Sequence, residues 1–410
     1  MKILMLCTKP PWPAKDGGTL AMLNMVRAYH QLGHKVTVLT MNTSKHYLYL
    51  RNLPTEIQEM ATFVAVDVNT SISYIDFMAN LLFSKDPYHI QRFTSRPFLE
   101  EVKRMLKNKG GFDVVQLETL YTVPYAKFIQ AESDALVSFR AHNIEHEIWD
   151  RRSRNMRNPF KRFAYAETAY RLKSYEAQAV TQRSFDVMVP ITNKDAGSFR
   201  FMGADLPIHV APVGMDLKMI QKIRGTLPCE NRSVFYLGAM DWEPNIEGMD
   251  WFLKEVWPLV HARFPDVPFY LAGRNMPPRY MRIAKQNIQV VGEVESAEEF
   301  IQSKGIMVAP ILSGSGMRVK VVEGMAHGKP IVATPVAVEG IGPKHGEQIM
   351  IEGEPEDFAE RIIFLLQHKD IYELMGQKAA AFIERGFENR AVTDKLIKFY
   401  QTHLKQKKGR

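Results

Sequence analysis

The stretch GSGMRVKVVEGMAHGKP, residues 314–330, joins two apolar segments that have the length and composition of buried strands. Residues 305–311, GIMVAPI, precede it, and residues 331–334, IVAT, follow it. Short apolar runs of this kind are typical of parallel strands that are covered on both faces. Gly328 and Pro330 end the helix expected between the strands, because glycine favours a helix end and proline cannot continue one. The stretch therefore predicts a strand–loop–helix–strand unit of an α/β fold.

The start of this expected helix has the features of an anion site. Gly314 and Gly316 allow the backbone to approach a ligand closely, and the first amides of a helix stabilise negative charge. Arg318 and Lys320 add two positive charges, so a diphosphate group fits the combination. Glu323 follows Lys320 by three residues on the same side of the helix, where its carboxylate can accept hydrogen bonds from two neighbouring hydroxyls, such as those of a ribose.

The same alternation of short strands and longer amphipathic stretches runs through all 410 residues, which is too long a chain for one hydrophobic core. The clearest strands are residues 36–40, 114–117, 135–139, 234–238, 269–273 and 288–292. The pattern predicts two doubly wound parallel-sheet domains, with a boundary near residue 212 in the Pro- and Gly-containing segment 211–216. The expected parts are residues 1–211, residues 212–388, and a C-terminal helix and tail, residues 389–410, that packs back on the first domain. The polar tail from residue 405 is expected to be frayed.

Ligands of open parallel sheets bind beyond the carboxyl ends of the strands, so two facing domains of this kind would place a site in the cleft between them. Gly17 and Gly18 follow the first strand and precede a helix starting near Thr19, and His142 follows the strand at residues 136–139. Both positions would face that cleft. A plain turn at residues 17–18 and a structural histidine at position 142 remain alternatives.

The formal net charge of +8 favours an anionic partner, which can be a nucleotide, an acidic membrane surface or a nucleic acid. The chain has no zinc-ligand spacing, aromatic RNA-binding signature or helix-turn-helix pattern, so nucleic acid is not expected. Residues 149–163 interleave basic and aromatic side chains, a pattern that fits peripheral contact with anionic lipid as well as an ordinary solvated helix face. These side chains are Trp149, Arg151, Arg152, Arg154, Arg157, Phe160, Lys161, Arg162 and Phe163.

The chain has no apolar run of roughly 18 residues, as a membrane span requires, and no recognisable signal peptide. Its two cysteines, Cys7 and Cys229, give no indication of a disulfide framework. A cytoplasmic protein is therefore expected, peripheral on the inner face of the membrane at most.

Taken together, the motifs resemble those of the family-4 (group 1) retaining glycosyltransferases, which have the GT-B fold of two Rossmann-like domains facing a central cleft. The resemblance covers almost the whole chain and is carried by residues 314–330, 213–216, 16–18 and 237–245. It implies transfer of a sugar, with retained configuration, from a nucleotide-diphosphate donor to an acceptor hydroxyl. The donor would be a UDP- or GDP-sugar, and the acceptor a sugar or lipid-linked sugar in surface polysaccharide, exopolysaccharide or glycolipid biosynthesis.

The resemblance also assigns site residues. Glu323 matches the second acid of the paired-glutamate motif and would hold the donor ribose, while His142 would lie against the transferred sugar; these two are the candidate catalytic residues. Trp242 is a possible lid or base-stacking residue. The expected donor-binding residues are Gly17, Gly18, Arg274, Gly314, Ser315, Gly316, Met317, Arg318, Lys320 and Glu323.

The chain departs from the family pattern at two places. Ser315 stands eight residues before Glu323, where the family usually has its first motif glutamate. The usual basic pair after the first strand of the second domain is absent, and Arg274 could supply one of those charges.

The absence of several catalytic motifs from the sequence also constrains the chemistry. The sequence contains no Gly-x-Ser-x-Gly elbow, no metal-ligand cluster and no Asp-x-Asp motif, so we expect neither a protein nucleophile, nor a bound metal, nor a cofactor beyond the nucleotide sugar. A dinucleotide dehydrogenase is disfavoured because no Gly-x-Gly-x-x-Gly follows the first strand. Two alternatives stay open, a GT-B sugar-nucleotide epimerase or hydrolase, and a non-catalytic nucleotide-binding scaffold.

Overall fold

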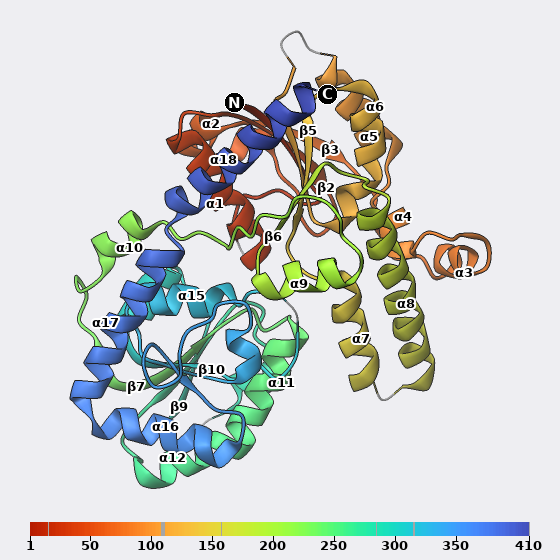
Figure 1. The fold of residues 1–410 in the computed structure, drawn as a ribbon. Coiled ribbons are helices and arrows are strands. Elements are labelled where there is room, and N and C mark those ends of the chain that lie inside the picture. Colours follow the sequence, from red (N-terminus) through yellow and green to blue (C-terminus); the bar gives the residue numbers. More distant parts are fainter. Residues whose placement is uncertain (15, 108–110, 157, 284, 315, 410) are drawn as a thin grey trace. The chain divides into compact units, whose positions relative to one another are not determined.

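The structure is a computed structural model that describes residues 1–410 except 15, 108–110, 157, 284, 315 and 410. The chain forms two compact units (Figure 1). The first domain comprises Met1–Gly214 together with Asn389–Arg410, and the second domain comprises Met215–Glu388. Each is built on a six-stranded sheet whose neighbouring strands all run parallel. The predicted class, a two-domain doubly wound α/β protein, is confirmed.

The sheet of the first domain has the strand order β3-β2-β1-β4-β5-β6. Its strands are β1 (Lys2–Cys7), β2 (Lys35–Asn42), β3 (Thr62–Asp67), β4 (Val114–Glu118), β5 (Leu136–Ala141) and β6 (Val187–Pro190). Its α-helices are α1 (Gly17–Gln31), α2 (Thr55–Met60), α3 (Tyr74–Phe83), α4 (Tyr88–Gln91), α5 (Arg96–Leu106), α6 (Ala126–Glu132), α7 (Glu145–Asn155), α8 (Pro159–Thr181), α9 (Asn193–Phe201) and α18 (Asn389–Lys408). Two short 3₁₀ helices, η1 (Leu50–Asn52) and η2 (Leu120–Tyr125), complete it.

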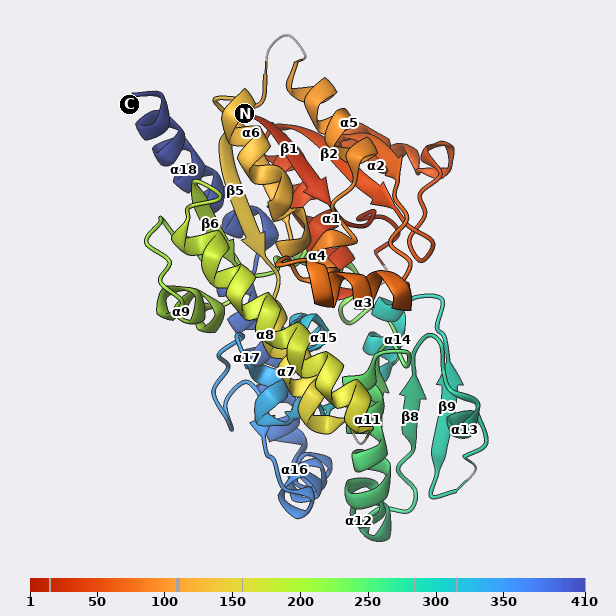
Figure 2. The ribbon, with the colours of Figure 1, turned by 90° about the vertical axis from the view of Figure 1, so that its right-hand side faces the viewer.

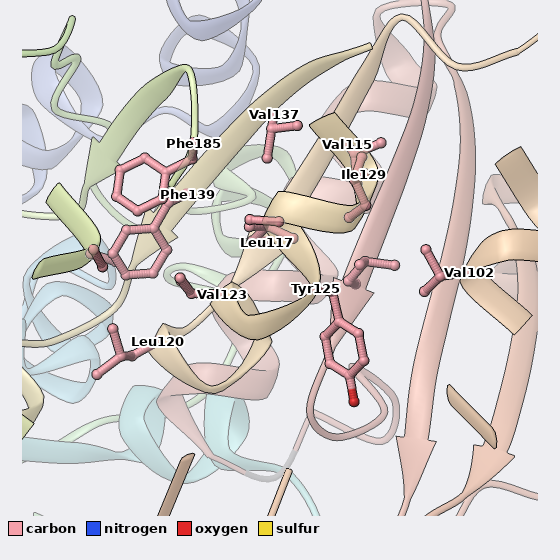
Figure 3. Close-up of a cluster of buried hydrophobic side chains, with 14 of the residues drawn as sticks. Val102, Val115, Leu117, Leu120, Val123, Tyr125, Ile129, Val137, Phe139 and Phe185 are labelled. Atoms are coloured by element: carbon pink, nitrogen blue, oxygen red, sulfur yellow. The ribbon is translucent and has the colours of Figure 1, made fainter. Parts of the chain in front are cut away.

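The central strand β1 shows why both faces of this sheet carry helices. Ile3, Met5 and Cys7 point to one face, where they belong to a buried cluster with side chains of α1 and α18. Leu4 and Leu6 point to the other face and belong to a cluster with side chains of α5, α6 and α8. Figure 3 shows part of this second cluster, including Val102 of α5 and Ile129 of α6. A strand that is apolar at every position can only be stable when both faces are covered.

The two places where the chain crosses between the domains are tied together by Asn24 of α1. The Asn24 side-chain amide donates to the carbonyl oxygen of Gly214, and the Asn389 side-chain amide donates to the carbonyl oxygen of Asn24, both at 2.7 Å. A methyl group added at Gly214 would lie 2.4 Å from Oδ1 of Asn389, so glycine is needed at this crossing.

The sheet of the second domain has the order β12-β11-β10-β7-β8-β9, seen in Figure 2 for β8 and β9. Its strands are β7 (Glu230–Leu237), β8 (Phe269–Ala272), β9 (Ile288–Gly292), β10 (Lys304–Ala309), β11 (Ile331–Ala333) and β12 (Met350–Ile351). Its helices are α10 (Leu217–Ile223), α11 (Glu243–Trp251), the π-helical segment η3 (Phe252–Val256), α12 (Trp257–Arg263), α13 (Pro278–Met281), α14 (Ala297–Ser303), α15 (Val319–Ala326), the 3₁₀ helix η4 (Pro335–Val338), α16 (Pro355–Gln367) and α17 (Lys369–Gly386).

Two glycines let the loops at the carboxyl ends of these strands pack backbone against backbone. A methyl group at Gly273, after β8, would lie 1.7 Å from the carbonyl oxygen of Gly238, after β7, and the φ of Gly273 is 152°. A methyl group at Gly248 of α11 would lie 1.8 Å from the carbonyl oxygen of Pro310, after β10. No side chain fits at either contact, so the loops that follow β7, β8 and β10 are held close together.

Two sequence predictions about helix ends were wrong. Helix α1 begins at Gly17 rather than near Thr19, because Asp16 and Thr19 cap it reciprocally: the Asp16 carboxylate accepts from the Thr19 amide and Thr19 Oγ1 accepts from the Asp16 amide. The tail is not frayed at residues 405–408, since α18 continues to Lys408 and Lys407 donates to Ala135 O and to Asp186 Oδ2.

We predict that Gly273→Ala lowers the stability of the second domain by about 3 kcal/mol, or about 6–12 °C in its thermal midpoint, since the added methyl group collides with backbone. Differential scanning calorimetry of the full chain measures this. Gly386→Ala is the control, because a methyl group there meets nothing within 4 Å. Equal midpoints for the two variants would show that the β7 and β8 loops are not packed as described.

Candidate active site

The loop between β10 and α15 has the backbone form that the sequence predicts for an anion site. Gly314 and Gly316 have φ values of 115° and 77°, which other residues rarely adopt. The Arg318 guanidinium lies over this loop, where Nη1 donates to the Gly316 carbonyl oxygen at 2.8 Å and Nη2 would lie 2.8 Å from a methyl group at Gly314. Among the described residues no side chain caps the N-terminus of α15, so its first amides have no side-chain acceptor there.

Lys320, in the first turn of α15, is anchored to the strand and helix beside it. Its ammonium group donates to the hydroxyl of Tyr236 and to Oδ1 of Asn245, both at 2.8 Å, and lies 4.5 Å from the centre of the Tyr236 ring. Burial, followed by the nearby charge of Arg318, lowers the pKa of Lys320 to about 7. A negatively charged ligand at this loop would restore the full positive charge of Lys320.

Glu323, one turn further along α15, is in the opposite situation. Burial, followed by the neighbouring carboxylate of Glu298, raises the pKa of Glu323 to about 7, although Lys320 acts in the other direction. Its carboxylate has no hydrogen bond or ion pair with any residue that the structure describes. A partly buried carboxylate without donors is costly, and no described residue replaces the water that Glu323 has lost.

The remaining residues predicted for the second domain lie at the neighbouring loops. Arg274, directly after β8, places Nη2 3.9 Å from Oδ1 of Asp241, and its backbone oxygen accepts from the Met240 amide. Trp242 precedes α11 and keeps 42% of its surface exposed, as a lid or stacking residue requires. Met317 is buried. Ser315 lies outside the residues that the structure describes.

In the first domain, the predicted residues Gly17 and Gly18 form the first turn of α1 behind a charged cap. The Lys9 ammonium donates to both oxygens of the Asp16 carboxylate, at 2.8 and 2.7 Å. Although burial alone would raise it, the charge of Lys9 and the Thr19 amide lower the pKa of Asp16 to about 2. A phosphate at this helix start would therefore meet the carboxylate as well as the amides of Gly17 and Gly18.

His142 belongs to a buried charged cluster at the carboxyl ends of β4 and β5. The parallel register sets Glu118, the last residue of β4, opposite Arg140 of β5. Glu118 Oε2 lies 2.5 Å from Nε2 of His142 and 3.4 Å from Nη1 of Arg140, and Oε1 accepts from the amide of Gln116. Burial would raise the pKa of Glu118, but Arg140 and then His142 lower it to about 2.

This cluster sets the tautomer of His142. Burial is the largest effect and lowers the pKa of His142, while the Glu118 carboxylate counteracts it. Nε2 of His142 lies 2.5 Å from the Glu118 carboxylate and 3.2 Å from Nη1 of Arg140, which can only donate. The shorter contact, to the charged carboxylate, favours the proton on Nε2 of the neutral ring, which leaves Nδ1 as a hydrogen-bond acceptor. Nδ1 has no hydrogen bond to a described residue, so it can accept one from a hydroxyl of a ligand.

The residues that hold the predicted ones in place were not predicted from the sequence. Glu118 follows the predicted strand 114–117 by one residue, and a charged side chain at the end of a buried strand was the available signal. Tyr236 lies inside the predicted strand 234–238, and Asn245 lies in the segment that follows it. Nothing in their spacing indicated that both would bind the Lys320 ammonium, because that contact depends on the packing of α11 beside α15.

The basic and aromatic segment at residues 149–163 forms the end of α7 and the start of α8. Arg151 pairs with Glu147 and Arg154 with Asp150, at 3.3 and 2.6 Å, and the Arg152 guanidinium lies 5.2 Å from the ring centre of Trp149. Arg157 lies outside the described residues. On α7 the charges are therefore largely those of an ion-paired helix surface.

A hollow of about 630 Å³ lies in the first domain, away from every predicted site residue. Its lining includes Asn42, Tyr47, Tyr49 and Asp67, at the carboxyl ends of β2 and β3. The predicted residues therefore do not coincide with it.

We predict that Glu118→Gln destabilises the protein by about 3 kcal/mol at pH 7, since it leaves the buried Arg140 charge without a counter-charge. The pKa of Glu118 is lower in the folded protein than in the unfolded chain, so its contribution is complete above about pH 4.5 and is lost as the pH falls towards 2. Denaturant unfolding between pH 2 and 7 measures both effects. The stabilities of the wild type and Glu118→Gln should converge at low pH. The control Glu59→Gln changes an exposed glutamate of the same domain and should match the wild type at every pH. A wild-type pH dependence of stability for Glu118→Gln would contradict the role of the cluster.

Comparisons with other proteins agree with this architecture. Residues 231–368 match the family described as Glycosyl transferases group 1. The chain is 23% identical over 412 residues, 97% of its own length and 99% of the other, to an uncharacterized 44.6 kDa protein in the cps region of Klebsiella pneumoniae. It is 26% identical over 182 residues, 43% of its own length and 48% of the other, to the phosphatidyl-myo-inositol mannosyltransferase of Mycobacterium leprae (strain TN).

Solved structures share the fold over nearly the whole chain. The structure of HepE from Anabaena in complex with UDP and glucose has a TM-score of 0.66 and 14% identity, and covers 98% of this chain and 99% of its own. The sucrose-phosphate synthase of Thermosynechococcus elongatus has a TM-score of 0.71 at 14% identity, with the same coverage. Residues 231–368 thus match the group 1 glycosyl transferases, and with two parallel six-stranded sheets the chain has the GT-B fold that these solved structures share.

Proposed function

We propose that this glycosyltransferase binds a nucleoside-diphosphate sugar at the carboxyl edge of β7, β8 and β10, and transfers the sugar with retention to the hydroxyl of a saccharide or lipid-linked saccharide. The observation that carries the proposal is the Glu323 carboxylate, which has a pKa of about 7 and no partner among the described residues. Two adjacent ribose hydroxyls would supply the two donors that this carboxylate lacks.

The diphosphate would lie at the start of α15. The glycines at positions 314 and 316, the first amides of the helix and the Arg318 guanidinium form one continuous positive surface there. Lys320 lies one residue inside the helix, and the approach of the phosphate charge would raise its lowered pKa. Binding of the donor would thus stabilise the positive charge of Lys320 and supply hydrogen bonds to the Glu323 carboxylate.

The leaving diphosphate needs its developing charge stabilised, and Arg318, Lys320 and the helix start would do this. In a retaining transfer without a protein nucleophile, the departing phosphate oxygen takes the proton of the incoming hydroxyl on the same face of the sugar. His142 would accept a hydrogen bond from the transferred sugar through Nδ1, and Gly17 and Gly18 would contact phosphate or acceptor. Arg274 and Trp242 would contact the diphosphate and the base.

The proposal includes transfer without a metal ion, since the cationic groups at α15 would take the role of a divalent cation. Among the residues that the structure describes, no group of three or more His, Cys, Asp and Glu side chains could hold a metal ion. The donor base is proposed to be uracil or guanine, and the bound UDP of HepE supports uracil. The Klebsiella relative in the cps region supports a role in surface polysaccharide synthesis, which would place the reaction in the cytoplasm where donor sugars are made.

We predict that UDP or its sugar conjugates, out of a panel with GDP, ADP and CMP, raise the thermal midpoint with and without EDTA. A ligand at 100 times its Kd stabilises by about 2.7 kcal/mol. Glu323→Gln should lose this shift. In the ligand-free state at pH 8 the same variant should be more stable than the wild type, because the raised pKa of Glu323 makes its ionised form a burden above about pH 7.

Glu360→Gln is the matched control, an exposed glutamate of α16 in the same domain. It should keep both the nucleotide shift and the wild-type midpoint. His142→Ala should lower kcat more than it weakens donor binding. Wild-type donor binding by Glu323→Gln would overturn the site, and loss of the shift in EDTA would overturn metal independence. Turnover of the donor to an isomeric sugar nucleotide without an acceptor would identify an epimerase, and release of free sugar alone a hydrolase.

A further inference from the structure

The first domain exposes an unusual amount of apolar side chain in one region. Among the described residues, the large apolar side chains that are roughly two-thirds or more exposed lie, apart from Phe201, in residues 72–83 and 160–170. We call their outer face the α3–α8 apolar surface. On and beside α3 it consists of Ile72, Tyr74, Ile75, Met78, Leu82 and Phe83, and on α8 it consists of Phe160, Phe163 and Tyr170.

Helix α3 is held firmly with this face outward. Its inner face contributes Asn80, which is buried, and Phe77, whose ring packs edge-on against Tyr88 of α4 at 5.6 Å. Ser73 caps its N-terminus. The outer positions 74, 75, 78 and 82 share one side of the helix, and Figure 1 shows α3 projecting from the body of the first domain. Tyr74, Ile75 and Phe83 are 81%, 82% and 87% exposed, so they contribute little to the core.

Arg171 joins the two helices into one surface. Its guanidinium donates to the carbonyl oxygens of Asn80, Leu81 and Ser84 at the end of α3, at distances of 2.8 to 3.3 Å. Tyr170, the residue before it, is on the exposed side of α8 together with Phe160 and Phe163, which precede it at helical spacing. The Arg171 contacts therefore bring the end of α3 next to the part of α8 that carries Tyr170.

The charges around this surface are mainly positive. Lys85 follows α3, and Lys161, Arg162 and Lys173 lie on α8; all four are exposed and have no ion pair with a described residue. Asp76 of α3 and Asp86, the residue after Lys85, are exposed acids, and Glu167 of α8 is neutralised by Arg171, so the positive excess lies on α8. Aromatic and aliphatic side chains bordered by unpaired lysines and arginines are the composition that inserts into the headgroup region of an anionic bilayer.

We propose that the α3–α8 apolar surface docks on an anionic lipid bilayer, with its apolar side chains at the level of the acyl-chain boundary and its lysines and arginines at the lipid phosphates. The contact would be peripheral, since no described helix combines the length and hydropathy that crossing a bilayer requires. Such docking would hold the first domain at the surface where a lipid-linked acceptor is presented. It does not depend on the identity of the donor, so its test is separate from that of the transfer reaction.

Vesicle co-sedimentation of the full chain tests the proposal, with vesicles of phosphatidylglycerol and phosphatidylethanolamine compared with vesicles of phosphatidylcholine. The wild type should bind the anionic vesicles. The variant Tyr74→Ser/Ile75→Ser/Phe83→Ser should bind them roughly tenfold or more weakly, because it removes the apolar insertion. Lys161→Ser/Arg162→Ser should weaken binding to the anionic vesicles about fivefold per charge, an effect that added salt should reproduce in the wild type.

Phe201→Ser is the control, since Phe201 of α9 is 93% exposed but lies outside the α3–α8 apolar surface. It should bind vesicles as the wild type does. Every variant changes exposed side chains, so thermal midpoints and nucleotide binding should stay at wild-type values. Equal vesicle binding by the triple variant and the wild type would overturn the proposal. So would a wild-type dimer in sedimentation velocity that the triple variant converts to a monomer without any vesicle binding, because the surface would then be an interface between two copies of this chain.

Discussion

The hydrogen bonds that Lys320 donates to Tyr236 and Asn245 hold the start of α15 against β7 and α11, and the rest of the proposed donor site depends on this contact. The contact fixes the direction of α15, and with it the positions of the preceding glycine loop and of Glu323 one turn later. It needs Gly238, because a methyl group there would lie 2.6 Å from the Lys320 nitrogen. A buried ammonium is unstable without such partners, so the same bonds that place the helix also keep the lysine in the site.

A comparison of Glu118 with Glu323 shows the difference between a structural charge and one that we propose is kept for a ligand. Glu118 is hydrogen-bonded or ion-paired to Gln116, Arg140 and His142, and its pKa is lowered to about 2. Glu323 has no such partner among the described residues, and its pKa is raised to about 7. Since one pKa unit corresponds to about 1.4 kcal/mol, the unsatisfied state of Glu323 is a real cost to the ligand-free protein. Evolution tolerates such a cost most readily where binding removes it, which is why Glu323 is the strongest single indication of the donor site.

Most of the fold could be predicted from sequence because its strands are apolar at nearly every position and short glycine-containing loops separate them from helices. Residues 305–334 alone predict two strands with a loop and α15 between them, and these local signals suffice because they need no knowledge of neighbouring elements. The start of α1 was misplaced because a reciprocal cap between Asp16 and Thr19 extends the helix over two glycines. A C-terminal helix was predicted, but its continuation to Lys408 was not, because Lys407 contacts Asp186, more than 200 residues away in sequence.

In the candidate site, too, contacts between elements that are distant in sequence could not be predicted. Lys320 and Glu323 could be selected from their spacing on one helix, whereas Tyr236, Asn245 and Glu118 reach the site through sheet register and helix packing. Only part of the α3–α8 apolar surface could be predicted from the sequence. The basic and aromatic residues of α8 could be identified, but the sequence of α3 is that of an ordinary core helix, and only the structure shows that its apolar face is exposed. Exposure is a property of the whole fold, so composition alone could not reveal it.

The central claim is that Glu323 lacks donors until a nucleotide sugar supplies them. The most direct measurement is a ¹³C NMR titration of glutamate carboxylates in the wild type, with the Glu323 signal assigned by its absence in Glu323→Gln. We expect the pKa of Glu323 to be near 7 in the ligand-free protein and to decrease clearly when the donor nucleotide saturates the site, because hydroxyl donors stabilise the ionised carboxylate. A pKa near the ordinary glutamate value that does not change with nucleotide would contradict it.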